Sequence, residues 1–340
     1  MDISYIRRIL GGASFKKLSS VVDKVCEKTG KSRISVFLDI LRCTKKYGAG
    51  YYDYLIFGFY DLPAEKRATY VTRMISRKLN LFLNNANYMH CFDNKDEFNR
   101  IFTDFIRRSW ISVDKADKNA FRHFCLGKDE IFAKIRDGEC SHGVERIRTA
   151  DYPDFDALYE HIKSCGYGLV EDVVDQHPAL EALHPGSVNC MRIITLLDDN
   201  GEPHCLYAVQ KIGMGDSFVD CNCMFAPVDI ETGIIKYPAH SGETPLRIIY
   251  TEHPDSHITI PGYRIPFVPE AVAMCLKAAK IVPQVRYVGW DVAISKEGPE
   301  FIEGNTYCAH DFWQLPAHTP DRVGMLPVFK KYAAGLKDVL

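Results

Sequence analysis

A short acidic hairpin near the C-terminus constrains this chain more than any other part of its sequence. The segment YVGWDVAISKEGPEFIEGN contains two apolar, β-like runs separated by turn-forming residues. Glu303 and Asn305 are two positions apart, so in a strand they point to one side, and the same alternation puts Phe301 there too. Asp291 lies twelve residues before Glu303. A hairpin between the two runs would therefore bring both carboxylates together.

Oxygen-bearing side chains grouped in this way suggest a metal site. Carboxylate and amide oxygens are the ligands that Mg²⁺ prefers in proteins. Three of them at one end of a sheet could hold one or two Mg²⁺ ions against nucleotide phosphates. The alternative is a plain hairpin whose polar side chains face water. Spacing alone does not separate the two interpretations.

Composition indicates a globular protein without an obvious polyanionic partner. The 340 residues are 46% hydrophobic and 25% charged, enough for a sizeable core and two or three structural units. The net charge of −2 gives no basic excess that would favour nucleic acid, although a local patch is compatible with it. No apolar run is long enough to span a membrane, and no signal-peptide core is present. None of the twelve cysteines forms a C-x-x-C pair. We therefore expect a cytoplasmic protein with no membrane span and no nucleic-acid partner.

Residues 1–90 are predicted to be mostly helical. One helix is expected over residues 32–48, ending at Gly48, and another over residues 62–84, with a proline near its first turn. The apolar positions of the first helix are Ile34, Phe37, Leu38 and Leu41.

After residue 90 the pattern becomes mixed. The β-like runs lie at residues 129–135, 167–174, 191–197, 204–213, 287–295 and 300–305. Helical segments are expected at 97–110 and 269–282. An α+β enzyme core behind a helical N-terminal region is the simplest description.

A second stretch, residues 130–147, suggests phosphate binding. Lys134 lies in a β-like run and is followed by a turn that contains Gly138, Ser141, His142 and Gly143. Backbone N–H groups of such a loop can cradle phosphate oxygens while a lysine supplies charge. The turn matches neither standard glycine-rich motif, so a surface turn is the alternative. Lys95 opens a helix-like stretch, where an exposed cap is the alternative.

Taken in order, four segments resemble the ATP-grasp superfamily. They are FDNKDEF, IFAKIRDGECSHGV, GLVEDVVDQHPALEALHPGSVNCMRIITLL and VGWDVAISKEGPEFIEGN. The resemblance covers roughly residues 30–325 and is closest to the sugar-transfer-associated, polysaccharide-biosynthesis-related branch. It implies an ATP-grasp fold, in which two α+β subdomains clasp ATP. The implied division is a helical region at 1–90, a small subdomain with a phosphate-covering loop at 91–170 and a subdomain with metal ligands at 171–340.

The resemblance also implies roles for individual residues. Lys95 and Lys134 match the lysines that reach the ATP phosphates, and the 138–143 turn matches the phosphate-covering loop. Glu171, Asp172 and Val174 match the hinge strand beside adenine, and Asn189 and Asn222 complete the nucleotide-binding set. Arg192 and Lys211 match basic, catalytic positions near the transferred phosphate. Asp291, Glu303 and Asn305 match the ligands of Mg²⁺, for which Mn²⁺ is an alternative.

One segment departs from the family pattern. The basic residue is Lys211 where relatives have arginine, and VDCNCMF has Cys221 where an asparagine is expected, with Asn222 next to it and no Gly-Gly turn. Lysine cannot reproduce the two-pronged hydrogen bonding of arginine. The departure concerns the way the γ-phosphate or the second substrate is held rather than ATP binding.

The implied reaction is a ligation that forms ADP and phosphate. ATP activates a carboxylate as an acyl phosphate, and an amine or similar nucleophile displaces the phosphate, in cell-surface glycan or natural-product synthesis. The partners are a small carboxylate and an amine or sugar-type acceptor. Two alternatives stay open, a kinase acting on a hydroxyl group and a non-catalytic nucleotide-binding scaffold. The general base is also open among His142, His177, His253 and His310.

Overall fold

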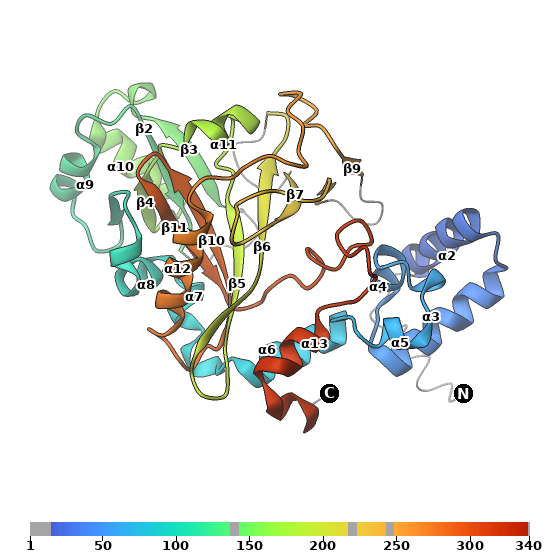
Figure 1. The fold of residues 1–340 in the computed structure, drawn as a ribbon. Helices are drawn as coiled ribbons and strands as arrows, with labels where there is room; N and C mark the ends of the chain where they lie inside the picture. The colour runs from blue at the N-terminus through green and yellow to red at the C-terminus, as the bar shows by residue number, and fades with distance from the viewer. Residues whose placement is uncertain (1–14, 137–142, 217–222, 243–247, 339–340) are drawn as a thin grey trace. The chain divides into compact units, whose positions relative to one another are not determined.

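The structure, a computed structural model, describes residues 15–136, 143–216, 223–242 and 248–338. It contains two compact units (Figure 1). The first comprises the described residues of Met1–Leu79, Glu243–Ile248 and Ala309–Leu340, and the second those of Asn80–Gly242 and Ile249–Cys308. The predicted α+β class with a helical N-terminal region is confirmed. The boundaries proposed at residues 90 and 170 stay a prediction.

The first unit is helical. Its elements are α2 (Phe15–Thr29), α3 (Arg33–Tyr47), α4 (Tyr51–Ile56), η1 (Phe59–Asp61), α5 (Ala64–Arg67), the start of α6 (Arg73–Leu83), α13 (Leu326–Tyr332) and η5 (Ala334–Asp338). The predicted 32–48 helix forms with Ser32 as its N-cap and ends at Gly48, whose φ of 63° is the left-handed conformation that glycine adopts without strain.

The buried face of α3 differs from the predicted one. Val36, Ile40 and Cys43 are buried with Leu41, whereas Ile34 is 74% exposed and Leu38 is 36% exposed. The helix has apolar residues on two overlapping stripes, and the helices that pack on it decide which stripe is buried.

The predicted 62–84 helix is interrupted between α5 and α6. The backbone N–H of Val71 donates to the side chain of Gln314 at 2.8 Å, and the Val71 carbonyl accepts from the same amide at 3.0 Å. The backbone N–H of Arg73 donates to Asp53 at 2.9 Å. These tertiary hydrogen bonds satisfy backbone groups outside a helix, so the chain can break there.

The second unit contains a small antiparallel sheet with the order β1-β4-β2-β3. Its strands are β1 (Trp110–Ser112), β2 (Glu130–Lys134), β3 (Val144–Arg148) and β4 (Leu169–Asp172). Helices α9 (Lys118–Cys125) and α10 (Phe155–Ser164) cover one face, where their apolar side chains form a core with Ile131 and Ala133 of β2 and Val170 of β4.

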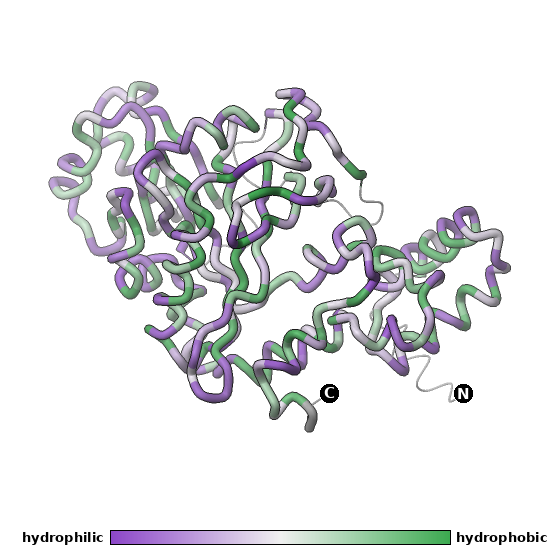
Figure 2. The backbone as a smooth tube through the Cα atoms, in the orientation of Figure 1, coloured by the Kyte–Doolittle hydropathy of each residue, from purple (hydrophilic) through white to green (hydrophobic). Residues whose placement is uncertain are grey.

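The larger sheet of this unit is also antiparallel, with the order β11-β10-β5-β6-β7-β8-β9 (Figure 1). Its strands are β5 (Met191–Leu197), β6 (Pro203–Gly213), β7 (Cys223–Val228), β8 (Ala239–Ser241), β9 (Ile249–Tyr250), β10 (Tyr287–Ser295) and β11 (Gly298–Asn305). The central strands β5 and β6 are largely hydrophobic (Figure 2). Of the six predicted β-like runs, all contain a strand; the short strands β1, β3, β8 and β9 and strand β7 were not predicted.

Helices cover one face of this sheet. They include α7 (His90–Asp93), α8 (Lys95–Ile101), α11 (Pro178–Leu183) and α12 (Val268–Ala279), with 3₁₀ turns η2 (Ala86–Tyr88), η3 (Thr103–Phe105) and η4 (Thr149–Asp151) elsewhere in the unit. Trp290 stacks on Phe301 at 4.7 Å between ring centroids and contacts the aromatic rings of α7 and α8. The helix predicted at 97–110 is shorter than expected: α8 ends at Ile101 and is followed by η3 and β1.

Among the described helices, none combines the length and the apolar character that crossing a lipid bilayer requires.

Candidate functional site

Charged side chains form a row across one face of the larger sheet. In the antiparallel register, Arg192 on β5 lies opposite Asp291 on β10, and Asp291 lies opposite Glu303 on β11. Paired residues in neighbouring strands project to the same face. Asn305, two positions beyond Glu303, lies on this face and donates to Glu303 at 3.3 Å. The sheet thus brings together all three predicted metal ligands.

A β-bulge in β11 decides which side chains share the face with Asp291, and it corrects the prediction made for Phe301. The register shifts so that Glu303 lies opposite Asp291 while Phe301 lies opposite Val292, which leaves Ile302 as an extra residue. Phe301 consequently joins Trp290 in the hydrophobic core. The expectation that Phe301 shares a side with Glu303 was wrong, because regular alternation does not continue through a bulge.

Asp291 is held by two cations. The Arg192 guanidinium donates to both of its carboxylate oxygens, at 2.5 and 2.8 Å, and Lys211 Nζ on β6 lies 3.3 Å from Asp291 Oδ2. All three side chains are about 10% exposed or less. Such a two-pronged contact fixes the guanidinium plane, so Arg192 has one defined direction on the sheet.

The two carboxylates of the row have opposite electrostatic environments. Burial would raise the pKa of Asp291, but the positive charges of Arg192 and Lys211 outweigh it and hold that pKa below its ordinary value. Burial and the neighbouring Asp291 charge raise the pKa of Glu303, partly offset by Lys95 and the two cations. Glu303 is therefore the carboxylate of the row that lacks full charge compensation from the protein.

This donor set fits a hard divalent cation. Glu303 and Asn305 supply oxygen donors side by side, and a cation there would relieve the repulsion between Glu303 and Asp291. Both oxygens of Asp291 are bonded to Arg192, so this residue could contribute to a metal only by sharing its charge with that arginine. Glu303 and Asn305 are accordingly the principal candidate ligands.

A second charged cluster lies on the face of the small sheet opposite α9 and α10. Lys134 Nζ at the end of β2 contacts Glu171 on β4 at 2.5 Å, and the amide of Asn99 donates to Glu171 at 3.1 Å. Burial would raise the pKa of Glu171, but Arg108 and Lys134 hold it below its ordinary value. Lys134 thus has a fixed position beside the predicted hinge strand.

Arg108, which was not predicted, joins the two sheets. Its guanidinium lies 3.1 Å from Glu171 on β4 and 3.0 Å from Glu300 on β11, and its Nη1 donates to the Phe301 carbonyl at 2.5 Å. All three charged side chains are about 3% exposed. The sequence signal was slight, an arginine pair in a segment expected to be helical. The role of Arg108 depends on Glu171 and Glu300, which lie far away in the chain.

Three other residues predicted to contact the nucleotide, Lys95, Asp172 and Val174, lie in different elements. Lys95 is the first residue of α8, and its backbone N–H donates to the Arg136 carbonyl at 3.3 Å. Asp172 forms an ion pair with Lys128 at 2.6 Å, and its backbone N–H donates to Ser109. Val174 lines a cavity of about 170 Å³ between the hinge strand, Phe132 of β2 and the 185–188 loop.

The structure describes only some of the residues predicted in the phosphate-covering loop and the two predicted asparagines. Gly143 has a φ of 71°, and a Cβ there would lie 2.5 Å from the Ile135 side chain, so the turn requires glycine. Gly138, Ser141, His142 and Asn222 lie outside the described residues. Asn189 is buried, and its amide donates to the carbonyls of Leu180 and His184.

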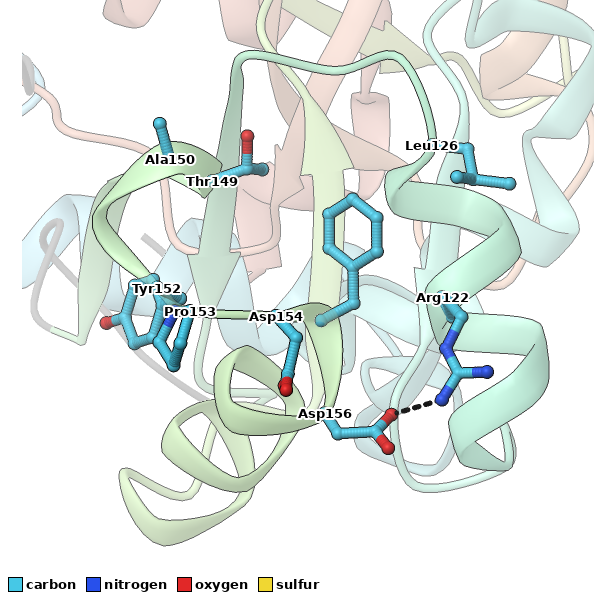
Figure 3. Close-up of a pocket in the computed structure, with 9 residues that line it drawn as sticks. Arg122, Leu126, Thr149, Ala150, Tyr152, Pro153, Asp154 and Asp156 are labelled. Carbon is cyan, nitrogen blue, oxygen red and sulfur yellow. Dashed lines mark hydrogen bonds and ion pairs between the residues drawn. The ribbon is translucent and has the colours of Figure 1, made fainter.

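A larger cavity, of about 600 Å³, lies away from this site (Figure 3). It is an open depression lined by residues of α9, η4 and the start of α10, and an ion pair joins Arg122 to Asp156 at 2.8 Å. It contains no cluster of acid, base and metal-binding groups of the kind found on the larger sheet.

Comparison with known proteins agrees with the resemblance. Residues 153–320 match the family described as sugar-transfer-associated ATP-grasp. No curated protein matches the sequence.

Solved structures that resemble the chain include three ligases. The ATP-grasp ligase PsnB with its minimal precursor is 13% identical over 72% of this chain and 60% of its own, with a TM-score of 0.42. The Staphylococcus aureus N5-carboxyaminoimidazole synthetase with ADP is 10% identical over 69% and 52%, with a TM-score of 0.44. The Coxiella burnetii D-alanine-D-alanine ligase is 11% identical over 78% and 67%, with a TM-score of 0.40. The chain thus spans 60% of the length of PsnB.

Proposed function

Because this chain belongs to the sugar-transfer-associated ATP-grasp family, we propose that it binds Mg-ATP and uses it to join a carboxylate to an amine or a similar nucleophile. The family assignment agrees with the resemblance read from the sequence, and the ATP-grasp fold class predicted there holds. The proposal adds a reaction, a metal and site residues to that assignment.

The single observation that supports the reaction is the charged row on the larger sheet. Glu303 and Asn305 present oxygen donors next to two cations, Arg192 and Lys211, that are anchored on Asp291. A triphosphate needs this combination, in which a divalent cation and fixed cationic side chains offset its charge. Lys134 and Lys95 supply further positive charge from the small sheet and from α8.

Each group then has a defined task. Glu303 and Asn305 hold Mg²⁺, or Mn²⁺ in its place, which when bound neutralises charge on the phosphate oxygens. Lys95 and Lys134 hold the phosphates, and the cavity beside Val174 receives the adenine. Arg192 and Lys211 orient the γ-phosphoryl group for in-line attack by the carboxylate oxygen.

The bond changes follow from that arrangement. The carboxylate oxygen attacks the γ-phosphorus, the bond to the β–γ bridging oxygen breaks, and ADP leaves. The acceptor nitrogen then attacks the acyl carbon, loses its proton, and phosphate departs. No side-chain nucleophile is needed, because catalysis consists of positioning and charge neutralisation. Cell-surface glycan or natural-product synthesis is the proposed setting, with the acidic and amino substrates as small molecules.

The first test combines product detection with a matched pair of variants. The full chain is incubated with ATP, Mg²⁺ and pooled amino acids and sugar acids, and condensed products are sought by mass spectrometry. Glu303→Gln removes the charge that a metal needs and should lower turnover by roughly 100-fold or more. Glu297→Gln, at an exposed position of the same hairpin, should leave turnover unchanged.

The outcomes separate the reaction classes. A condensed product that needs both a carboxylate and an amine supports the ligase. A stable phosphorylated product from one hydroxyl acceptor would replace the ligase by a kinase. Nucleotide binding without acceptor-dependent hydrolysis, together with equal behaviour of Glu303→Gln and wild type, would indicate a scaffold instead.

A further inference from the structure

Charge is strongly segregated along the sequence. Residues 15–79 contain fourteen lysines and arginines against six aspartates and glutamates, whereas residues 80–340 contain twenty-six against thirty-seven. The near-neutral total conceals a basic N-terminal segment, residues 15–79, and an acidic remainder of the chain. A segment with such a basic excess attracts polyanions or anionic surfaces.

Helix α6 carries the most unusual part of this basic segment. Its sequence, RMISRKLNLFL, contains no acidic residue. One side of the helix is buried through Ser76, Leu79, Asn80 and Leu83. The side chains of the other side are all exposed: Arg73, Met74, Arg77, Lys78, Leu81 and Phe82. Three cations and three large apolar groups therefore share a single solvent-facing surface, which we call the α6 outer face.

The apolar part of the α6 outer face is substantial. Leu81 is 73% exposed, Met74 is 47% exposed and Phe82 is 39% exposed. Single exposed apolar residues are common on protein surfaces, but a group of them framed by arginine and lysine is typical of helices that lie in a membrane interface. At about 1.5 Å per residue, eleven residues extend roughly 16 Å, which is too short to span a bilayer but long enough to lie along its surface.

Helix α3, in the first unit, repeats this chemistry. Ile34 and Leu38 are exposed and continue along one helical stripe into Arg42 and Lys45, which are exposed as well. Ile34 and Leu38, which sequence periodicity assigned to the core, thus face solvent beside two cationic side chains.

We propose that the α6 outer face docks the protein on an anionic phospholipid surface. Arginine and lysine attract the lipid phosphates, while Met74, Leu81 and Phe82 enter the headgroup region. Both contributions are needed because either alone gives weak, reversible binding. A lipid surface is favoured over nucleic acid because exposed aliphatic side chains gain free energy from a lipid interface and not from a phosphate backbone. The docking is independent of the proposed ligase reaction.

The test measures cosedimentation of the full chain with vesicles of phosphatidylcholine, with and without phosphatidylglycerol. Binding should require phosphatidylglycerol and weaken as salt is raised. Each basic residue contributes roughly fivefold in affinity, so Arg73→Gln with Arg77→Gln should weaken binding about 30-fold. Leu81→Ser with Phe82→Ser should weaken it by about tenfold or more at unchanged charge.

A matched control removes two charges elsewhere. Lys277→Gln with Lys280→Gln alters an exposed position of α12 and the exposed residue that caps its C-terminus, and should leave vesicle binding unchanged. All substituted residues are exposed, and equal thermal unfolding of the variants checks their folding.

Other outcomes would overturn the proposal. Equal binding to both vesicle types, or equal binding by the α6 variants and wild type, removes the anionic-lipid surface as the partner. Binding to duplex DNA without vesicle binding replaces the lipid by nucleic acid. If the protein forms a dimer that dissociates when the α6 outer face is substituted, the partner of this face is a second copy of the chain and not a lipid surface.

Discussion

At the residue scale, the electrostatic state of each charged group depends on neighbours that are distant in sequence. Asp291 and Glu303 face each other across two strands, yet the pKa of Asp291 is lowered by Arg192 and Lys211 while the pKa of Glu303 is raised by burial and by Asp291. The residue types and their spacing identified both carboxylates as candidates. Their different charge compensation could not be predicted, because Arg192 and Lys211 reach Asp291 only through the sheet register.

A histidine in the helical unit provides a pH test at this scale. Burial lowers the pKa of His310, but the hydrogen bond to Asp53 at 2.9 Å and the charge of that carboxylate outweigh it and raise the pKa above 6.5. A raised histidine pKa adds stability that is complete at pH values below the unfolded pKa and is lost as pH rises through the folded one. His310→Gln should therefore cost more unfolding free energy in mild acid than in mild alkali.

Urea unfolding of wild type and His310→Gln across this pH range measures the difference. His257→Gln, at an exposed position, controls for the general loss of an imidazole. A destabilisation by His310→Gln that grows toward alkaline pH contradicts the assigned ion pair.

At the element scale, hydrogen-bond pairing between strands decided what sequence alternation could not. The β10–β11 hairpin was predicted, and with it the shared face of Asp291, Glu303 and Asn305. The bulge at Ile302 reversed the expected side of Phe301, because one extra residue shifts the alternation of side chains. Nothing in the local sequence marks Ile302 as the extra residue.

Two single-residue deletions in β11 should have different effects. Deleting Ile302 restores regular pairing and leaves Phe301 in the core and Glu303 on the site face. Deleting Gly304 moves Asn305 into its place, where a Cβ would lie 2.7 Å from the Phe92 ring. Burying an unpaired amide in a full core should lower the unfolding free energy by about 3 kcal/mol or more.

Thermal and urea unfolding of the two deletion variants compare these costs. The assignment of the bulge predicts that the Ile302 deletion is the milder of the two. Equal or greater damage from deleting Ile302 would mean that the extra residue lies elsewhere in the strand.

At the scale of the whole molecule, ligand binding should raise the free energy of unfolding. If Glu303 and Asn305 hold the metal of Mg-ADP, the folded chain gains unfolding free energy by mass action, about 2.7 kcal/mol when the ligand is at 100 times its Kd. This gain should require Mg²⁺ and should largely disappear in Glu303→Gln. Differential scanning calorimetry with ADP, with and without Mg²⁺, measures it, and an equal gain without Mg²⁺ would argue against the proposed ligands.

The sequence by itself determined the strands that carry the site, the helical character of the N-terminal region and the residue types that suit a magnesium nucleotide. These follow from local periodicity, from turn residues and from donor chemistry, all of which are encoded within short stretches. Only the tertiary structure decided that Arg108 joins Glu171 to Glu300, that Arg192 and Lys211 hold Asp291, and that α3 buries Val36 rather than Ile34. Those outcomes depend on contacts between segments far apart in the chain, and a buried charge or an apolar stripe takes its role from the partner that folding brings to it.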